Sequence, residues 1–92
     1  MYRFPRLHAA LDYAADAHRE QSKKGADTPY LAHLLGVCSL VLDHGGTEDQ
    51  AIAALLHDVI EDAGAHHGAE IDRRFGAAVA RIVRDCTDAT LD

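Results

Sequence analysis

The chain has 92 residues, of which 48% are hydrophobic and 5% aromatic, and it carries a formal net charge of −6 at pH 7. A chain of this length forms one small domain, so residues 1–92 are expected to fold as a single unit. The acidic balance argues against direct nucleic-acid binding, because clustered lysines and arginines are what recruit a phosphate backbone.

No targeting segment or membrane span is predicted. The charged start of the chain is followed by no apolar core of a signal peptide, and no segment approaches the roughly 18 uninterrupted apolar residues that a span needs. Cys38 and Cys86 fit no CxxC metal spacing and are too few for a secreted disulfide framework, so we interpret both as reduced packing residues. We expect a cytoplasmic protein without a membrane partner.

The first two predicted helices are separated by a turn-rich segment. Apolar residues recur at helical spacing over residues 6–22, and the glycine, aspartate and proline of residues 23–29 end this helix. A second helix begins near Pro29, a residue type that suits the first helical turn, and reaches residue 43. Gly45 and Gly46 then supply a left-handed C-terminal cap.

Two more helices follow. Thr47, with Gln50 three positions on, forms a capping-box pattern that starts a third helix, which Gly64 ends. A fourth helix covers residues 70–85, where apolar residues recur at spacings of three and four. Nothing alternates with period two over the length of a strand. The fold class is therefore predicted to be all-α, a compact bundle of four to five helices.

Four ionisable side chains lie close together in the third predicted helix, in the stretch LLHDVIED. Residues four apart stack on one side of a helix, so His57 lies over Glu61. Asp58 lies over Asp62 for the same reason, and all four side chains are expected to point toward one pocket. Uncompensated charge is costly to bury, so a divalent cation would stabilise the group. The alternative is a solvated acidic face.

His33 offers a second imidazole, on the preceding predicted helix. Antiparallel packing of two helices joined by a short connection would bring it opposite His57. Imidazole and carboxylate ligands suit Mn²⁺, Fe²⁺, Co²⁺ or Zn²⁺, whereas Mg²⁺ prefers oxygen. The sequence thus predicts a metal site without fixing the ion.

Other aromatic and imidazole side chains receive plainer interpretations. His18 faces the apolar side of the first predicted helix and is interpreted as a satisfied structural histidine. His66 and His67 lie in a loop, where a solvated pair and a second metal site both stay open. Tyr30 either packs at the start of the second helix or stacks on a nucleobase.

Taken together, these motifs resemble the HD phosphohydrolase superfamily. Within it, the chain is most similar to the hydrolases of guanosine tetraphosphate (ppGpp), namely the hydrolase domain of the RelA/SpoT proteins and the small stand-alone metazoan-type homologues. The resemblance covers nearly the whole chain and runs through ALDYAADAHREQ, KKGADTPYLAHLLGV, AALLHDVIED, FGAAVARIV and the TD that follows. It implies an HD-type helical fold.

The resemblance also implies a role for individual residues. His33, His57 and Asp58 correspond to metal ligands, with Mn²⁺ the usual ion. The acidic pair that orients or deprotonates the attacking water corresponds to Glu61 and Asp62. The substrate-binding positions are Lys23, Lys24, Tyr30 and Thr87. The implied reaction removes the 3′-diphosphate of ppGpp or pppGpp and gives GDP or GTP and pyrophosphate.

One feature of the family pattern has no counterpart here. The family completes its metal sphere with an aspartate from a later helix, in a motif resembling ADKLxN, and this chain contains no asparagine. The expectation is either a fragment lacking the C-terminal helices or a natural short form with a three-ligand site, which binds metal more weakly. An apolar strip along the third and fourth helices would then favour a homo-oligomer.

Two alternative functions stay open at this point. The first is a catalytically silent module that binds a nucleotide or a metal without turnover. The second is an HD-type nucleotidase that acts on other nucleotides, such as deoxynucleotide monophosphates.

Overall fold

The computed structural model describes the backbone of residues 4–91 and the side chains of residues 4–86. Within these residues the chain forms helices and no strand, so the predicted all-α class is confirmed. The helices are α1 (Leu7–Ala17), α2 (Leu31–Asp43), α3 (Glu48–Leu56), α4 (Val59–Ala63), α5 (His67–Phe75) and α6 (Ala77–Leu91). None of the helices in the described part has the length and apolarity that a bilayer crossing requires.

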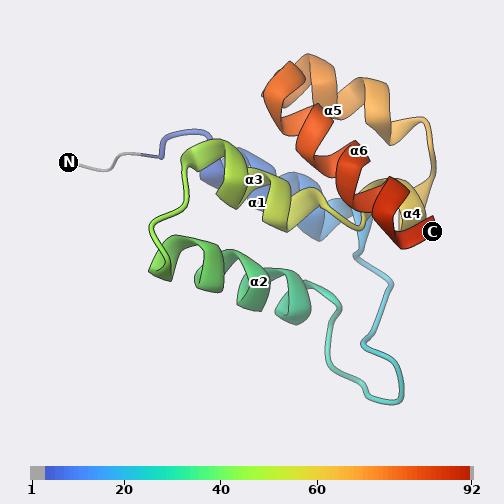
Figure 1. The fold of residues 1–92 in the computed structure, drawn as a ribbon. Coiled ribbons are helices and arrows are strands. Elements are labelled where there is room, and N and C mark those ends of the chain that lie inside the picture. The colour runs from blue at the N-terminus through green and yellow to red at the C-terminus, as the bar shows by residue number, and fades with distance from the viewer. Residues whose placement is uncertain (1–3, 92) are drawn as a thin grey trace.

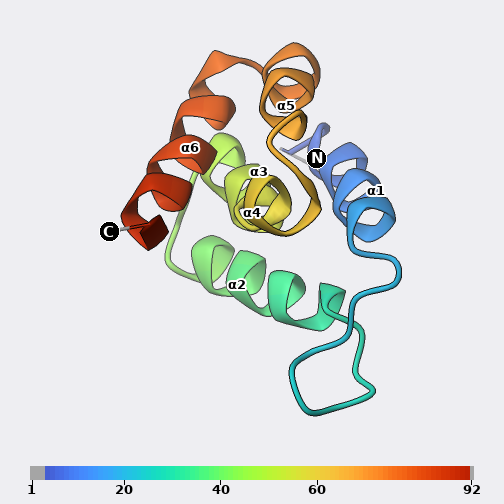
Figure 2. The ribbon, with the colours of Figure 1, turned by 90° about the vertical axis from the view of Figure 1, so that its right-hand side faces the viewer.

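Helix α3 lies at the centre of the bundle and packs against α1, α2 and α6 (Figures 1 and 2). It has no polar face between residues 51 and 56, all of which are buried: Ala51, Ile52, Ala53, Ala54, Leu55 and Leu56. A helix that is apolar all round belongs in a core. Ala10 and Ala14 of α1 are fully buried, and such small side chains let two helix backbones approach closely.

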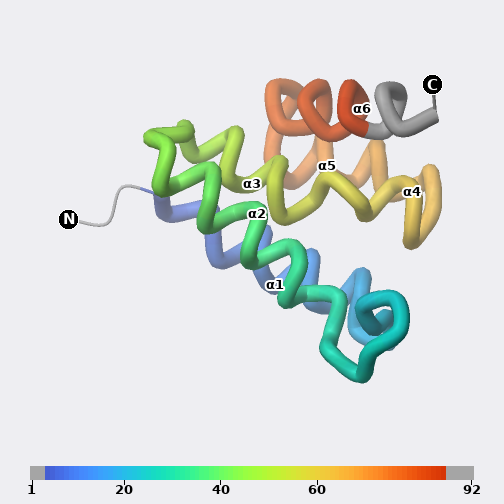
Figure 3. Tube along the Cα trace, turned by 60° about the horizontal axis from the view of Figure 1, so that its bottom comes forward, coloured from blue at the N-terminus to red at the C-terminus, as the bar shows by residue number. Residues whose placement is uncertain are grey.

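The start and end signals between α2 and α3 are those that the sequence predicted. Gly45 adopts a φ of 78°, the left-handed conformation that ends α2. Thr47 forms the predicted capping box, because its side chain accepts from the Gln50 amide while the Gln50 side chain accepts from the Thr47 amide. This short connection makes α2 and α3 antiparallel neighbours (Figures 1 and 3).

The prediction of one continuous helix from Thr47 to Gly64 is wrong. Helix α3 ends at Leu56, and α4 begins at Val59 and continues in nearly the same direction (Figure 3). Between them the ring nitrogen Nδ1 of His57 bonds to the Ala54 carbonyl oxygen at 2.6 Å, and Asp58 has φ of −97° and ψ of −2°, at some distance from the ideal helical values. In a continuous helix, the Ala54 carbonyl would accept a hydrogen bond from the amide of residue 58. Here the same carbonyl accepts from the His57 side chain, and this bond accompanies the break. If α3 and α4 are counted as one interrupted helix, the described residues form five helices, within the predicted four to five.

The other helix boundaries also differ from the prediction. Helix α1 ends at Ala17 instead of residue 22, and residues 18–30 form a loop that an isolated bridge between Ser22 and Pro29 closes. The fourth predicted helix begins earlier, at His67, and is divided into α5 and α6 at Gly76, whose φ is 97°. A residue in this conformation cannot continue a right-handed helix.

The interpretation of the cysteines holds for one of the two. Cys38 has a free thiol, as predicted, and is buried against the core. Cys86 is exposed on α6, so its interpretation as a packing residue is wrong.

Candidate metal centre and nucleotide site

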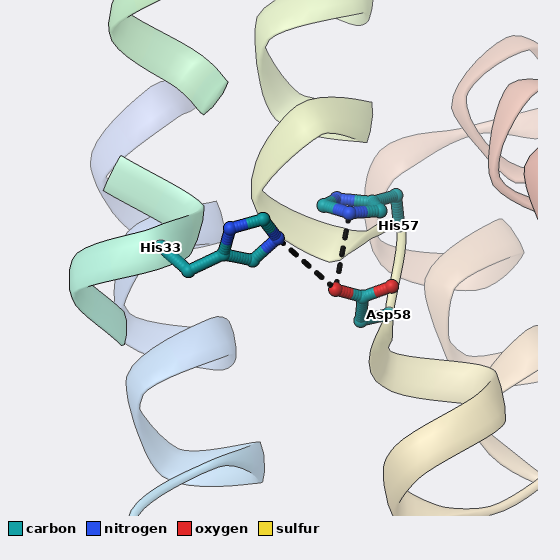
Figure 4. A group of neighbouring side chains, drawn as sticks. All are labelled: His33, His57 and Asp58. Carbon is teal, nitrogen blue, oxygen red and sulfur yellow. Dashed lines mark ion pairs between the residues drawn. The ribbon is translucent and has the colours of Figure 1, made fainter. Parts of the chain in front are cut away.

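Two imidazoles and one carboxylate converge where α2 passes the break between α3 and α4 (Figure 4). His33 comes from the first turn of α2, while His57 and Asp58 occupy the break itself. One potential ligand atom from each of the three side chains lies within 4.8 Å of the others. The Nε2 atoms of His33 and His57 lie 3.6 Å and 3.0 Å from Asp58 Oδ2. The structure therefore brings together residues that are far apart in the sequence.

Each of the two residues in the break is held by a neighbour outside the group. The Ala54 carbonyl accepts from Nδ1 of His57, so Nδ1 carries a proton and Nε2 is the nitrogen that faces Asp58. Tyr30 donates its hydroxyl proton to Asp58 Oδ2 at 2.5 Å. Such outer contacts fix ring and carboxylate orientation, as they do around metal ligands in general.

The contact between His57 and Asp58 shifts the pKa of both side chains. The bond to Asp58 raises the pKa of His57, against an opposing effect of burial, and the negative charge of Asp62 adds a smaller increase. The same bond lowers the pKa of Asp58, as does the bond from Tyr30. Burial and the nearby carboxylates raise the pKa of Tyr30. At pH values below the raised pKa of His57, a cation at Nε2 would compete with a proton.

The donor set fits a transition-metal ion. Two imidazole nitrogens and one carboxylate oxygen suit Mn²⁺, Fe²⁺, Co²⁺ or Zn²⁺ better than Mg²⁺. The site is open on one side, since the His33 side chain is 41% exposed, whereas those of His57 and Asp58 are 23% and 18% exposed. A substrate can therefore approach from solvent. The described residues contain no other group of three or more such side chains with this geometry.

Glu61 and Asp62, the predicted acidic pair, lie beside the three converging side chains. Both residues lie on α4 and are exposed, and neither belongs to the converging group. The helical spacing of Asp58 and Asp62 is retained, because the Asp62 amide bonds to the Asp58 carbonyl at 2.9 Å. The two carboxylates are still near the group, because the charge of each contributes to the raised pKa of Tyr30.

The predicted substrate-binding residues fall in different places. Lys23 and Lys24 are exposed in the loop of residues 18–30, at the end of the molecule where α2 begins (Figure 1). Tyr30 lies against the converging group rather than in open space, bonded to Asp58. Thr87 belongs to α6, and its side chain lies outside what the structure describes.

Sequence reasoning missed Gln21 and misjudged His18. His18 is 3% exposed, as a structural histidine should be, and its Nδ1 lies 2.8 Å from Gln21 Oε1. Its other ring nitrogen, Nε2, is buried and has no partner among the described residues, so the residue is not satisfied. The amide nitrogen of Gln21 lies 3.3 Å from Asp62 Oδ2. The sequence contained one signal for this contact, because His18 and Gln21 are three residues apart and side chains at that spacing are neighbours on a helix.

The pair His66 and His67 is only partly solvated. His66 is exposed, but Nδ1 of His67 lies 2.5 Å from the Tyr13 hydroxyl, and the two rings meet edge to face. A cleft of about 580 Å³ opens beside them between α1 and α5. Burial lowers the pKa of His67, which favours the neutral form of this ring.

Comparison with known proteins places the chain in a family. Residues 10–91 match a family model described as "HD domain". The chain therefore belongs to the HD-domain family, and the resemblance noted from its motifs is confirmed.

The individual relatives carry a more specific name. The guanosine-3′,5′-bis(diphosphate) 3′-pyrophosphohydrolase MESH1 of Xenopus tropicalis is 42% identical over 82 residues, which is 86% of this chain and 45% of the relative. MESH1 of Homo sapiens is 40% identical over 85 residues, 89% of this chain and 47% of the relative. A pyrophosphohydrolase of the same name from Aquifex aeolicus (strain VF5) is 37% identical over 81 residues, 88% of this chain and 11% of the relative. The chain thus spans somewhat less than half the length of the MESH1 relatives.

Proposed function

We propose that this chain belongs to a metal-dependent phosphohydrolase that removes the 3′-diphosphate from ppGpp or pppGpp, giving GDP or GTP and pyrophosphate. The observation that carries the proposal is the convergence of His33, His57 and Asp58. The names of the relatives supply the substrate class.

The proposed ligands are His33, His57 and Asp58, and the proposed ion is Mn²⁺, with Fe²⁺, Co²⁺ and Zn²⁺ as alternatives. Bound there, a divalent cation would lower the pKa of a coordinated water and neutralise charge on the phosphoryl oxygens. The Ala54 carbonyl holds the His57 ring, and the Tyr30 hydroxyl holds the Asp58 carboxylate. Both contacts would limit the reorganisation that metal binding requires.

The acidic pair on α4 is proposed to manage the proton. Water attacks the phosphorus nearest the ribose, the bond from that phosphorus to the 3′-oxygen breaks, and the 3′-oxygen takes up a proton. Asp62 or Glu61 would accept the proton that the water loses. Both carboxylates are solvent-exposed on the element that directly follows the proposed ligands.

Binding of so anionic a substrate needs local positive charge. The chain has a formal net charge of −6, and the site itself is rich in carboxylates. Lys23 and Lys24 lie in the exposed loop at the end of the molecule where α2 begins (Figure 2), and we propose that they contact phosphate groups. Tyr30 and Thr87 remain proposed contacts to the nucleoside.

We also propose that the chain self-associates, through a surface that differs from the one expected from the sequence. The strip was expected along the third and fourth predicted helices, whereas the large exposed apolar side chains of the described residues lie on α2. They are Leu35, Leu40 and Leu42, at 44%, 60% and 36% exposure. A mostly apolar groove of about 470 Å³ runs between α2, α3 and α6. We expect a cytoplasmic homo-oligomer, and Leu40→Glu should shift it toward monomer in sedimentation experiments.

The activity is tested by incubating the purified chain with Mn²⁺ and ppGpp and measuring the release of pyrophosphate. Release should fall at least about 100-fold in His57→Ala. It should persist in His8→Ala, which removes an exposed histidine of α1. Turnover of dAMP but not of ppGpp would select the nucleotidase instead. Tight ppGpp binding without turnover by the native chain would indicate a silent binding module.

A further inference from the structure

Gln21 connects a buried histidine to the acidic pair of α4. Its side-chain oxygen Oε1 lies 2.8 Å from Nδ1 of His18, and its side-chain nitrogen Nε2 lies 3.3 Å from Oδ2 of Asp62. Asp62 is 41 residues away in the sequence. The loop that follows α1 is thereby joined to α4.

The chemistry of the three groups fixes the direction of both hydrogen bonds. An ionised carboxylate only accepts, so the amide nitrogen of Gln21 must face Asp62. The amide oxygen then faces His18, which must donate from Nδ1. This tautomer leaves Nε2 of His18 without a proton, in agreement with a buried nitrogen that has no acceptor beside it. His18 is 3% exposed and therefore has little freedom to release Gln21.

The backbone of Gln21 is fixed as firmly as its side chain. Its amide donates to the His18 carbonyl at 2.9 Å, and its carbonyl accepts from the Tyr30 amide at 2.8 Å. The rings of His18 and Tyr30 also pack at 5.0 Å between centroids. Since Tyr30 in turn bonds to Asp58, the same loop contacts both the proposed metal ligands and the proposed proton acceptor.

Asp62 has little else to orient it. It is exposed, and α4 is a helix of five residues at the surface. An exposed carboxylate samples several rotamers, and a fixed donor favours one of them. We propose that Gln21, oriented by His18, is a positioning residue that holds the Asp62 carboxylate for proton transfer. This inference rests on the proposed hydrolase function and deepens it.

The kinetic test replaces only the donor. Gln21→Glu keeps the size of the side chain and its acceptor toward His18, but turns an oxygen toward Asp62. We expect kcat to fall about 10- to 100-fold, with KM changed by less than about threefold, because the proposed phosphate contacts remain. Glu20→Gln, the opposite exchange at the neighbouring exposed residue, should leave both constants unchanged. In the Asp62→Asn variant, adding Gln21→Glu should lower kcat hardly any further.

A loss of kcat in Gln21→Glu that is undiminished in the Asp62→Asn background would overturn the inference, since it would show a structural effect. A change in kcat of less than about twofold, when Gln21→Glu is made in the otherwise native chain, would also overturn the inference.

A second test does not depend on activity. Long-range ¹H–¹⁵N spectra of the full chain should show His18 as the Nδ1–H tautomer, and Gln21→Leu should abolish that preference. The side-chain amide resonances of Gln21 should shift in Asp62→Asn and stay in place in Glu61→Gln. Equal responses to the two α4 variants would overturn the inference. If these spectra are as expected while the native chain turns over no nucleotide, the hydrolase proposal fails and the contact stands.

Discussion

At the scale of single residues, the pair His57 and Asp58 links metal binding to pH. Their contact raises the pKa of His57 and lowers that of Asp58. The proton on Nε2 of His57 competes with a cation, so Mn²⁺ affinity should fall up to about tenfold per pH unit below the raised pKa. Isothermal titration between about pH 8 and about pH 5.5 measures this slope. A flat profile would contradict a ligand role for His57.

The same pair predicts the opposite trend for stability without metal. A raised His57 pKa gives stability below the unfolded-state value of 6.5 that is lost as the pH rises through the folded value. A lowered Asp58 pKa gives stability above 3.8 that is lost as the pH falls through the folded value. In EDTA, the contribution of the pair should therefore be greatest between these pH values and decline as the pH rises through the folded-state pKa of His57. Above that pKa, the melting temperatures of the native chain and of the Asp58→Asn variant should converge.

Tyr30 is the residue whose role the structure changes most. Its hydroxyl is bonded to Asp58, so Tyr30→Phe removes that donor while keeping the ring. We expect Mn²⁺ affinity to fall about tenfold, as for other outer contacts to metal ligands. Tyr13→Phe makes the same chemical change at a hydroxyl that lies against His67 on α5, and should leave the affinity unchanged. Equal effects of the two variants would mean that the contact to Asp58 does not matter.

At the scale of helices and loops, the division of α5 from α6 depends on one backbone angle. Gly76 has φ of 97°, and a Cβ atom there would meet nothing within 4 Å, so Gly76→Ala costs strain rather than space. We expect a loss of about 1–2 kcal/mol in urea unfolding. Gly36→Ala, inside α2 with equally open space, should instead gain about 0.5–1 kcal/mol. A destabilising Gly36→Ala would contradict this reading of the two glycines.

Local signals were predictable and long-range ones were not. The capping box at Thr47 and the glycine after α2 are encoded within a few residues. The break at His57 is not, because the apolar spacing continues across it while a side-chain bond to Ala54 accompanies the change of backbone. Likewise, Gln21 gains its meaning from a partner on α4, which no pattern near residue 21 reveals.

At the scale of the whole molecule, antiparallel packing of α2 on α3 creates the site. The core around α3 is apolar on all sides, and the imidazoles meet just beyond its last buried residue, Leu56. Sequence reasoning anticipated that His33 would meet His57, because a short connection leaves two helices few other arrangements. It did not anticipate that α3 would end at Leu56, so that His57 and Asp58 lie between two helices.

The claim on which the whole account depends is that His33, His57 and Asp58 hold one cation. Electron paramagnetic resonance titration of the full chain with Mn²⁺ counts the bound ions directly. We predict one bound ion per chain, with affinity reduced at least about tenfold in His33→Ala and unchanged in His8→Ala. Binding that is absent from the native chain, or that survives intact in His33→Ala, would contradict it.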